Sequence, residues 1–426
     1  MRWLLILGLF GLCACGGGGG TKPASSSSVA LSSASSVVSS SVSSSSVSSA
    51  VNFPSYNTQP LAPDMAGMES TAAELAAQIR IGLNIGNTLE AWGGKSETYW
   101  GNPEITREFV AFAKASGFNA IRLPVSWDQY ADQASARIED AWLARVKEVV
   151  QYALDEDLYV LVNIHWDGGW LERNVIPETQ AEVAARQKAY WEQIATALRD
   201  FDQRLLFASA NEPHVENAQH LSVLHHYHQV FVDTVRATGG KNAYRVLVVQ
   251  GPDTDIEKTN QWAMSLPQDS VPDRLMMEVH FYSPYNFTLM EKDESWGNRF
   301  FYWGRGFHST TDTAYNATWG EEDYVDATLA LMKEQFADQG IPVILGEYGM
   351  GIRDHLTGEN LELHLASRAY YLNYVTRQAI ANGLLPFYWD TGGLLDRRLN
   401  SVKDAQGLEA LIDGASASTP YWKMDQ

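Results

Sequence analysis

Cysteine is nearly absent from this chain of 426 residues, because its two cysteines, Cys13 and Cys15, both lie close to the amino terminus. The remaining residues cannot form a disulfide with one another. A cysteine nucleophile and a cysteine-ligated metal are excluded there for the same reason. A domain without such cross-links depends on a large apolar core, and this chain is long enough to build one.

Basic residues are also scarce. The chain has 31 lysines and arginines against 51 aspartates and glutamates, which gives a formal net charge of -20. An acidic surface repels phosphate backbones and anionic lipid headgroups, so the composition argues against a nucleic-acid partner or direct lipid binding. The sequence contains no glycine-rich phosphate loop or dinucleotide fingerprint, and we expect neither a cofactor nor a metal.

The amino-terminal residues have the pattern of a leader. A basic start precedes an apolar run from Trp3 to Leu12, which is short for a membrane span and typical of a secretory signal. The segment 12–16 (LCACG) resembles a bacterial lipobox, and this resemblance implies cleavage before Cys15 and acylation of that residue. We expect residues 1–14 to be a lipoprotein signal and the protein to be exported and lipid-anchored at the outer membrane. An ordinary signal peptide is the alternative.

Residues 15–51 are glycine followed mostly by serine. Such a segment cannot bury enough apolar surface to offset the entropy of ordering it, so we predict a flexible linker. The rest of the chain, 52–426, has a globular composition and no second serine-rich stretch. We therefore expect one catalytic domain there.

Eight apolar runs alternate with helical patterns along this domain. Continuous apolar runs are typical of parallel strands covered on both faces. The expected strands are 79–87, 120–127, 159–166, 205–212, 244–252, 275–284, 342–349 and 385–392, and helical patterns include 139–154, 178–199, 219–235, 324–337 and 361–381. This alternation predicts an α/β fold, a single (β/α)₈ TIM barrel, whose active site lies where the strands end.

Polar and aromatic residues gather at the ends of the expected strands. Glu212 and Glu347 each follow an apolar run, where a carboxylate is costly to desolvate and usually has a function. Two carboxylates on different strands are the minimum equipment for glycosidic bond hydrolysis. The other candidates are Asn87, Arg122, His165, Trp166, Trp170, Asn211, His280, Tyr282 and Trp389. Each alone has an ordinary structural explanation, but their joint occurrence indicates a site.

Six motifs together resemble a known family. They are Ile121-Arg122-Leu123-Pro124, Asn163-Ile164-His165, Asn211-Glu212-Pro213, His280-Phe281-Tyr282, Gly346-Glu347-Tyr348-Gly349 and Trp389. In this order they resemble glycoside hydrolase family 5, whose members are (β/α)₈ retaining glycosidases. The segments 86–90 and 100–103 are more similar to its cellulase-like members than to its mannanases. Trp166 departs from the pattern, because many relatives carry a second histidine there.

The resemblance implies a double displacement with Glu347 as nucleophile and Glu212 as acid/base. Arg122 and Tyr282 would donate to Glu347 and lower its pKa. It further implies that Asn211 binds the sugar 2-hydroxyl, that His165 and His280 orient hydroxyls and the acid, and that Trp389 forms a stacking floor. Asn87, Trp166 and Trp170 are expected to contact substrate.

The substrate implied is a β-1,4-glucan: mixed-linkage β-1,3-1,4-glucan, cellulose or a related soluble glucan. A xyloglucan-specific endoglucanase or a mannanase on the same scaffold is the alternative, and a transglycosylase is a further one. An inactive sugar-binding lipoprotein is a non-enzyme reading, but a pure binder has no need of the intact catalytic set. The oligomeric state stays open.

Three further patterns carry expectations. Of seven loop tryptophans, three or four are expected to line sugar subsites: Trp92, Trp100, Trp166, Trp170, Trp296, Trp303 and Trp319. The long connection 285–323 is expected to wall the cleft or to make a subunit contact. Four histidines between residues 220 and 228 are expected on a solvated helix face and not at a metal: His220, His225, His226 and His228.

Overall fold

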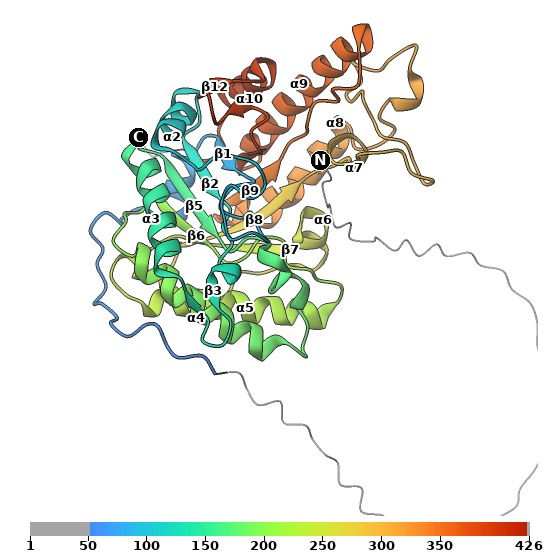
Figure 1. Cartoon of the computed structure of the whole chain (residues 1–426). Helices are drawn as coiled ribbons and strands as arrows, with labels where there is room; N and C mark the ends of the chain where they lie inside the picture. Colours follow the sequence, from blue (N-terminus) through green and yellow to red (C-terminus); the bar gives the residue numbers. More distant parts are fainter. Residues whose placement is uncertain (1–51, 424–426) are drawn as a thin grey trace, which may run out of the picture. The chain divides into compact units, whose positions relative to one another are not determined.

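The computed structural model describes residues 52–423, so the predicted signal, Cys15 and the predicted linker lie outside it (Figure 1). Eight parallel strands close into a barrel in the order β1-β10-β9-β8-β7-β6-β5-β2, which confirms the (β/α)₈ TIM barrel. The strands are β1 (Gly82–Ile85), β2 (Ala120–Leu123), β5 (Tyr159–Asn163), β6 (Leu205–Ala208), β7 (Leu247–Asp255), β8 (Leu275–Phe281), β9 (Val343–Tyr348) and β10 (Leu384–Asp390). All eight expected strands are present, most of them shorter than expected.

Helices surround the barrel (Figure 1). They are α2 (Arg107–Ala115), α3 (Asp140–Asp155), α4 (Gln180–Leu198), α5 (Ala218–Ala237), α6 (Ile256–Gln261), α8 (Glu322–Gln335), α9 (Gly358–Ala381) and α10 (Ala405–Ala417), with short α1 (Ala72–Ala76) and α7 (Tyr285–Thr288). Hairpins β3 (Ala131–Asp132) with β4 (Arg137–Ile138), and β11 (Leu395–Asp396) with β12 (Ser401–Val402), lie in loops. Among the residues described, no helix has the length and apolar character that a membrane crossing requires.

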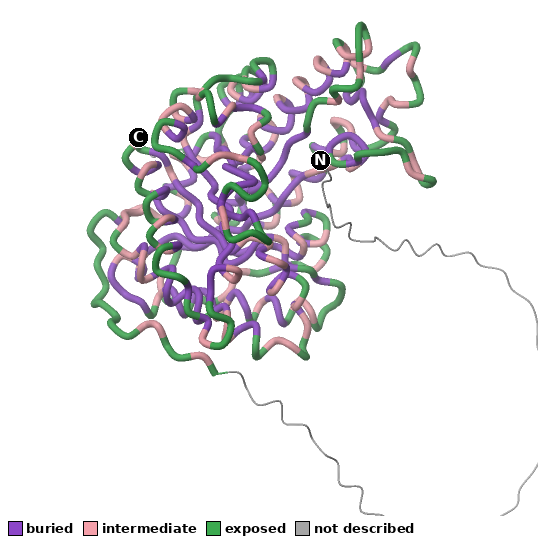
Figure 2. The backbone as a smooth tube through the Cα atoms, in the orientation of Figure 1, coloured by how far each residue is buried: buried purple, intermediate pink, exposed green. Residues whose placement is uncertain are grey.

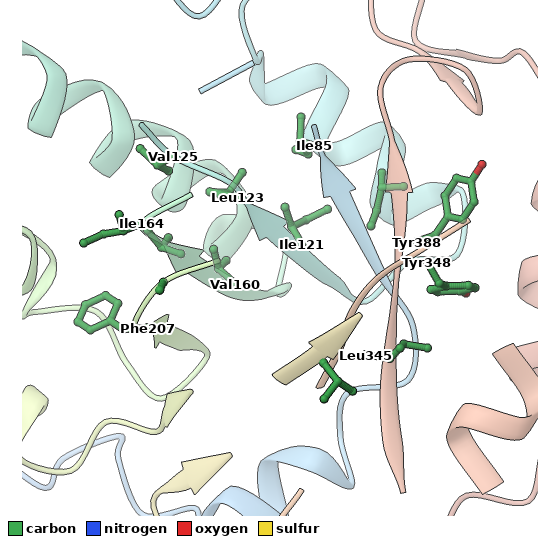
Figure 3. Close-up of a cluster of buried hydrophobic side chains, with 14 of the residues drawn as sticks. Ile85, Ile121, Leu123, Val125, Val160, Ile164, Phe207, Leu345, Tyr348 and Tyr388 are labelled. Atoms are coloured by element: carbon green, nitrogen blue, oxygen red, sulfur yellow. The ribbon is translucent and has the colours of Figure 1, made fainter. Parts of the chain in front are cut away.

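The apolar core has two layers. The larger layer packs the outward side chains of the strands against the helices, as the buried central strands of Figure 2 and the labelled side chains of Figure 3 show. The smaller layer fills the inside of the barrel, and it includes residues of α1, such as Leu75. Continuous apolar strands are required because both of their faces are buried.

Toward the carboxyl ends of the strands, the next inward-facing side chains are polar. Side chains two apart on a strand share a face. Ala120 and Met276 belong to the inner apolar layer, so Arg122 on β2, and Glu278 with His280 on β8, also point into the barrel. The site is therefore formed by the inward-facing residues closest to the carboxyl ends of the strands.

A bulge in β9 turns Glu347 into the barrel. Leu345 and Tyr348 both pack in the outer layer although they are three residues apart, and the pairing with β8 shifts register between them. The extra residue lets Gly346 and Glu347 both face inward. Glycine is required at 346, because a Cβ there would lie 2.1 Å from Oε1 of Glu278.

The connection from α7 to α8 packs against α9 and extends the larger core layer, to which Trp303 and Tyr371 belong. Trp303 is fully buried there, its ring meets Tyr371 edge-on at 5.0 Å between centroids, and its indole N–H donates to the carbonyl of Gly320 at 2.7 Å. Its backbone N–H donates to Ser367 at 2.6 Å. The insertion is thus ordered by aromatic packing.

Candidate active site

The fully buried side chain of Arg122 lies at the bottom of the site. Its Nη1 donates to Oε1 of Glu347 and to Oδ1 of Asn84, each at 2.9 Å. Its Nη2 donates to Oδ1 of Asn211 at 2.8 Å, and its Nε pairs with Oε1 of Glu278 at 2.9 Å. One guanidinium therefore fixes groups from β1, β8, β9 and the end of β6.

Glu212 and Glu347 face each other across the open end of the barrel. One carboxylate oxygen of each and a ring nitrogen of His280 lie within 4.8 Å of one another. The Glu347 side chain is 8% exposed, whereas that of Glu212 is 43% exposed. The Tyr282 hydroxyl donates to Oε2 of Glu347 at 3.0 Å. Such a short carboxylate separation matches a retaining glycosidase and is too small for the inverting geometry.

His280 lies between the two carboxylates. Its Nδ1 is 2.8 Å from Oε1 of Glu212 and 3.8 Å from Oε2 of Glu347, and its Nε2 is 3.4 Å from Oε1 of Glu278. Burial opposes the charged ring, but the charge of Glu347 and the hydrogen bonds to Glu212 and Glu278 outweigh burial and raise the pKa of His280 to about 9. The imidazole is therefore a cation at neutral pH.

The expected donors to Glu347 are in place, but their net effect differs from expectation. Burial raises the pKa of Glu347, while His280, Arg122 and Tyr282 each lower it. The sequence led us to expect a pKa below the ordinary value, and this was wrong because the carboxyl lies deeper than a strand end suggests. Burial and the charge of Glu347 raise the pKa of Tyr282 well above its usual value, so its hydroxyl keeps its proton.

His165 and Trp389 form one wall of the site. Their rings are stacked at 8° with centroids 5.6 Å apart, and the missing Cβ of Gly86 leaves room for the indole. Burial and the charge of Arg122 hold the pKa of His165 well below its usual value. The ring is thus neutral, and because the Asn163 amide lies 3.1 Å from Nδ1, its proton belongs on Nε2.

The remaining predicted contact residues divide into two groups. Asn87, in a left-handed conformation with φ 59°, and Trp166 lie in loops at the carboxyl ends of β1 and β5. Trp166 meets Trp92 edge-on at 5.5 Å between centroids, and Trp92 is 41% exposed. Trp170 instead packs edge-on against Tyr190 of α4 at 5.4 Å, which is a loop-packing contact.

The other loop tryptophans also differ in exposure. Trp100, Trp296 and Trp319 are exposed, and Trp296 lies over Tyr285 with centroids 6.3 Å apart. Trp303 is buried in the larger core layer. Four of the seven rings therefore present an exposed face, and Trp303 does not.

Sequence reasoning missed two buried carboxyls of the site. Glu278 pairs with Arg122 beneath Glu347 and accepts from Gln250 at 2.6 Å. Its position two residues before His280 on β8 was a usable signal, because side chains two apart share a face. Glu172 lies in the loop after β5 and accepts the backbone N–H of Glu212 at 2.8 Å; nothing in its surrounding sequence marked it.

The expectation for the helix histidines was wrong at His228. This residue is fully buried, and its ring contacts Oγ of Ser209 at 3.0 Å and the carbonyl of Gln250 at 2.9 Å. It lies on the inward stripe of α5 with Leu224 and Phe231. His226 is exposed as expected, and His220 and His225 are intermediate.

Known proteins resemble this chain in sequence and in fold. The family model "Cellulase (glycosyl hydrolase family 5)" matches residues 84–393. A xyloglucan-specific endo-β-1,4-glucanase of Bacteroides ovatus is 40% identical over 385 residues, 86% of this chain and 74% of the relative. The structure of a Bacteroides ovatus GH5 xyloglucanase with an XXXG heptasaccharide has a TM-score of 0.79 at 38% identity, covering 86% of this chain and 81% of that one. A GH5-4 broad specificity endoglucanase from Bacteroides salanitronis has a TM-score of 0.73 at 34% identity, with 84% and 98% coverage.

Proposed function

The chain belongs to glycosyl hydrolase family 5, and on that premise we propose that it is a retaining endo-β-1,4-glucanase that acts on xyloglucan or a related soluble β-1,4-glucan. The observation that carries the proposal is the approach of the Glu212 and Glu347 carboxylates to within 4.8 Å, with Arg122 and Tyr282 donating to Glu347.

In the first step Glu347 attacks the anomeric carbon while Glu212 protonates the departing glycosidic oxygen. The donors from Arg122 and Tyr282 hold the attacking carboxylate in one orientation. His280 supplies the proton reservoir, because its Nδ1 is hydrogen bonded to Glu212 and the two groups can exchange one proton. The first step ends with a covalent glycosyl-enzyme ester.

In the second step Glu212 acts as base toward water. Formation of the ester removes the negative charge of Glu347, so the carboxylate of Glu212 is left as the main acceptor facing the anomeric carbon. Asn211 accepts from Arg122 through its oxygen and hydrogen bonds to Glu172 through one N–H of its NH₂ group, so the second N–H is left to bind the sugar 2-hydroxyl. Trp389 and the Nε2 proton of His165 would contact the same sugar.

The order of substrates differs from the one the sequence favoured. The sequence ranked mixed-linkage and other soluble β-1,4-glucans above xyloglucan. We now place xyloglucan first, because the Bacteroides ovatus relative is a xyloglucan-specific endoglucanase and the ligand-bound structure is a xyloglucanase. The broad specificity endoglucanase supports keeping other soluble β-1,4-glucans as substrates.

The test uses the protein lacking residues 1–51, with Glu347→Ala as control. Reducing-sugar release and product length are measured on xyloglucan, barley β-glucan, carboxymethylcellulose and glucomannan. Release that is fastest on xyloglucan and absent in the control supports the proposal. Proton NMR of the first product must show the β-anomer. An initial α-anomer, or release from none of the four by a folded protein, contradicts the proposal.

We also propose, from the lipobox-like segment 12–16 alone, that the full chain is lipid-anchored through Cys15. Cys15→Ala in the full chain should then move the protein from the membrane fraction to the soluble exported fraction. An unchanged distribution contradicts the anchor without touching the catalytic proposal.

A further inference from the structure

The loop after β5 holds the end of β6 at two points. The Glu212 backbone N–H donates to Oε1 of Glu172 at 2.8 Å, and the His214 backbone N–H donates to the carbonyl of Glu172 at 3.0 Å. Both bonds come from one residue of the short 3₁₀ segment Glu172–Asn174, and they lie on either side of Pro213, which has no N–H. The strand end that bears the proposed acid/base is therefore tied to this loop.

Glu172 is buried at the edge of the site. It is 6% exposed, the side chain of Asn211 hydrogen bonds to its carboxyl, and the charges of Glu212 and Glu347 reach it. Burial first, and then the charge of Glu212, raise the pKa of Glu172 to about 8. At neutral pH the carboxyl accepts hydrogen bonds without adding a further negative charge to the site.

The proposed acid/base needs this support more than the nucleophile does. Glu347 lies on a strand and receives two side-chain donors, whereas Glu212 lies four residues beyond the end of β6 and has a side chain that is 43% exposed. A general acid acts only within hydrogen-bonding reach of the leaving oxygen, and a misplacement of about 1 Å can cost about 10²-fold in rate. The main chain of Glu212 is the part that a neighbouring loop can fix.

We propose that Glu172 is a positioning residue for acid/base catalysis, which fixes the main chain of Glu212 and the amide of Asn211 from the loop after β5. The inference rests on the proposed function of Glu212. Glu172 acts through these neighbours and does not contact the reacting atoms.

The test compares two leaving groups in the first chemical step. Phenyl and 2,4-dinitrophenyl β-glycosides of one oligosaccharide, cellotriose or XXXG, are used, because the dinitrophenolate leaves without protonation and phenolate needs the acid. For Glu172→Ala, kcat/KM should fall about 10- to 100-fold on the phenyl glycoside and less than about threefold on the dinitrophenyl glycoside. Glu172→Gln keeps an acceptor oxygen and should stay within about threefold of wild type on both.

Glu192 provides a matched control. It is also buried, and it lies on α4. Its carboxylate accepts hydrogen bonds from the backbone N–H groups of Tyr56 and Asn57, which are distant from the site residues in sequence. Glu192→Ala should lower the melting temperature and leave the ratio of the two kcat/KM values unchanged. This separates a loss of stability from a loss of acid catalysis.

Three outcomes decide the inference. An equal loss on both glycosides, or no loss in Glu172→Ala, overturns it. Glu172→Leu replaces Glu172→Ala if that variant does not fold, because leucine keeps most of the volume and removes the carboxyl oxygens while the backbone carbonyl stays. An inactive wild type on both glycosides and on all four glucans instead refutes the proposed function itself.

Discussion

The Nδ1 atom of His280 lies 2.8 Å from Oε1 of Glu212, so these two groups share one hydrogen-bonded proton. The pKa of His280 is raised to about 9, so this ring still carries a proton for Glu212 at neutral pH. This has a measurable consequence for the pH profile.

The alkaline limb of kcat/KM should fall through pH about 9 in the wild type, because the pKa of His280 is raised to about 9 and the shared proton leaves there. In His280→Gln the site loses the group that holds this proton, so the limb should move to lower pH. His165→Gln is the control: His165 is already neutral, so this variant should lose rate without moving the limb. An unmoved limb in His280→Gln contradicts the shared proton.

Azide should rescue the alanine variants of Glu347 and Glu212 with products of opposite anomeric configuration. Glu347→Ala should lose at least about 10⁴-fold in kcat, and azide entering on its side should yield an α-glycosyl azide by single inversion. Glu212→Ala should lose about 10²- to 10⁴-fold on glucan, and azide should yield a β-glycosyl azide from the covalent intermediate. NMR of the products checks the assignment, and exchanged configurations would reverse the two roles.

Removal of Arg122 should cost stability as well as activity. Its ion pairs with Glu278 and Glu347 are both 2.9 Å long, and all three side chains are buried. Arg122→Met leaves buried carboxylates without their cation, which should lower the free energy of unfolding by about 3–5 kcal/mol. The double variant Arg122→Met/Glu278→Gln should recover part of this loss in urea unfolding but no activity. No recovery would mean that the cost arises from packing.

Glu172 should make the stability of the domain depend on pH. Its pKa is about 8 when folded against 4.5 for the free group, so its contribution is full below pH 4.5 and is lost as the pH rises through 8. Relative to Glu172→Gln, the wild type should lose up to about 5 kcal/mol of unfolding free energy between pH 4.5 and pH 8, and none beyond it. Urea unfolding from pH 5 to pH 9 measures the difference, and parallel curves for the two proteins contradict the raised pKa.

The barrel could be predicted from the sequence because its signals are local. Each strand is an apolar run, and most of these runs contain or precede a chemically informative residue such as Arg122 or Glu347. The burial of His228 could also be predicted, because helical spacing places it on the same face of α5 as the apolar residues Leu224 and Phe231.

The features that could not be predicted from the sequence depend on contacts between neighbouring strands and loops. The bulge at Gly346 and Glu347 exists because β9 must keep register with both β8 and β10, and one strand's sequence does not contain that constraint. Glu172 reaches Glu212 across 40 residues, from a loop that has no periodicity. The raised pKa of Glu347 likewise comes from burial by surrounding elements and not from its own motif.

The insertion between β8 and α8 should bind the polymer rather than assist the chemistry. Trp296 is 63% exposed over Tyr285, and the Trp319 indole N–H donates to Oδ1 of Asn286 at 3.2 Å; both partners begin α7, only three and four residues after Tyr282. Flat exposed rings at this position suit the apolar faces of glucose units.

The double variant Trp296→Ala/Trp319→Ala should therefore raise KM on the preferred glucan about tenfold and shift its product lengths, since each ring contributes about 0.5–1.5 kcal/mol. Hydrolysis of a short aryl glycoside, which does not reach the insertion, should stay within about twofold. Leu61→Ala, at an exposed apolar residue of the amino-terminal segment, should change neither. Trp303→Ala should instead destabilise the insertion by about 3–5 kcal/mol, because that ring is fully buried. Equal losses on polymer and aryl glycoside in the double variant would assign the two exposed rings to packing, and the wall of the cleft would have to be sought on the β1 side, at Trp92.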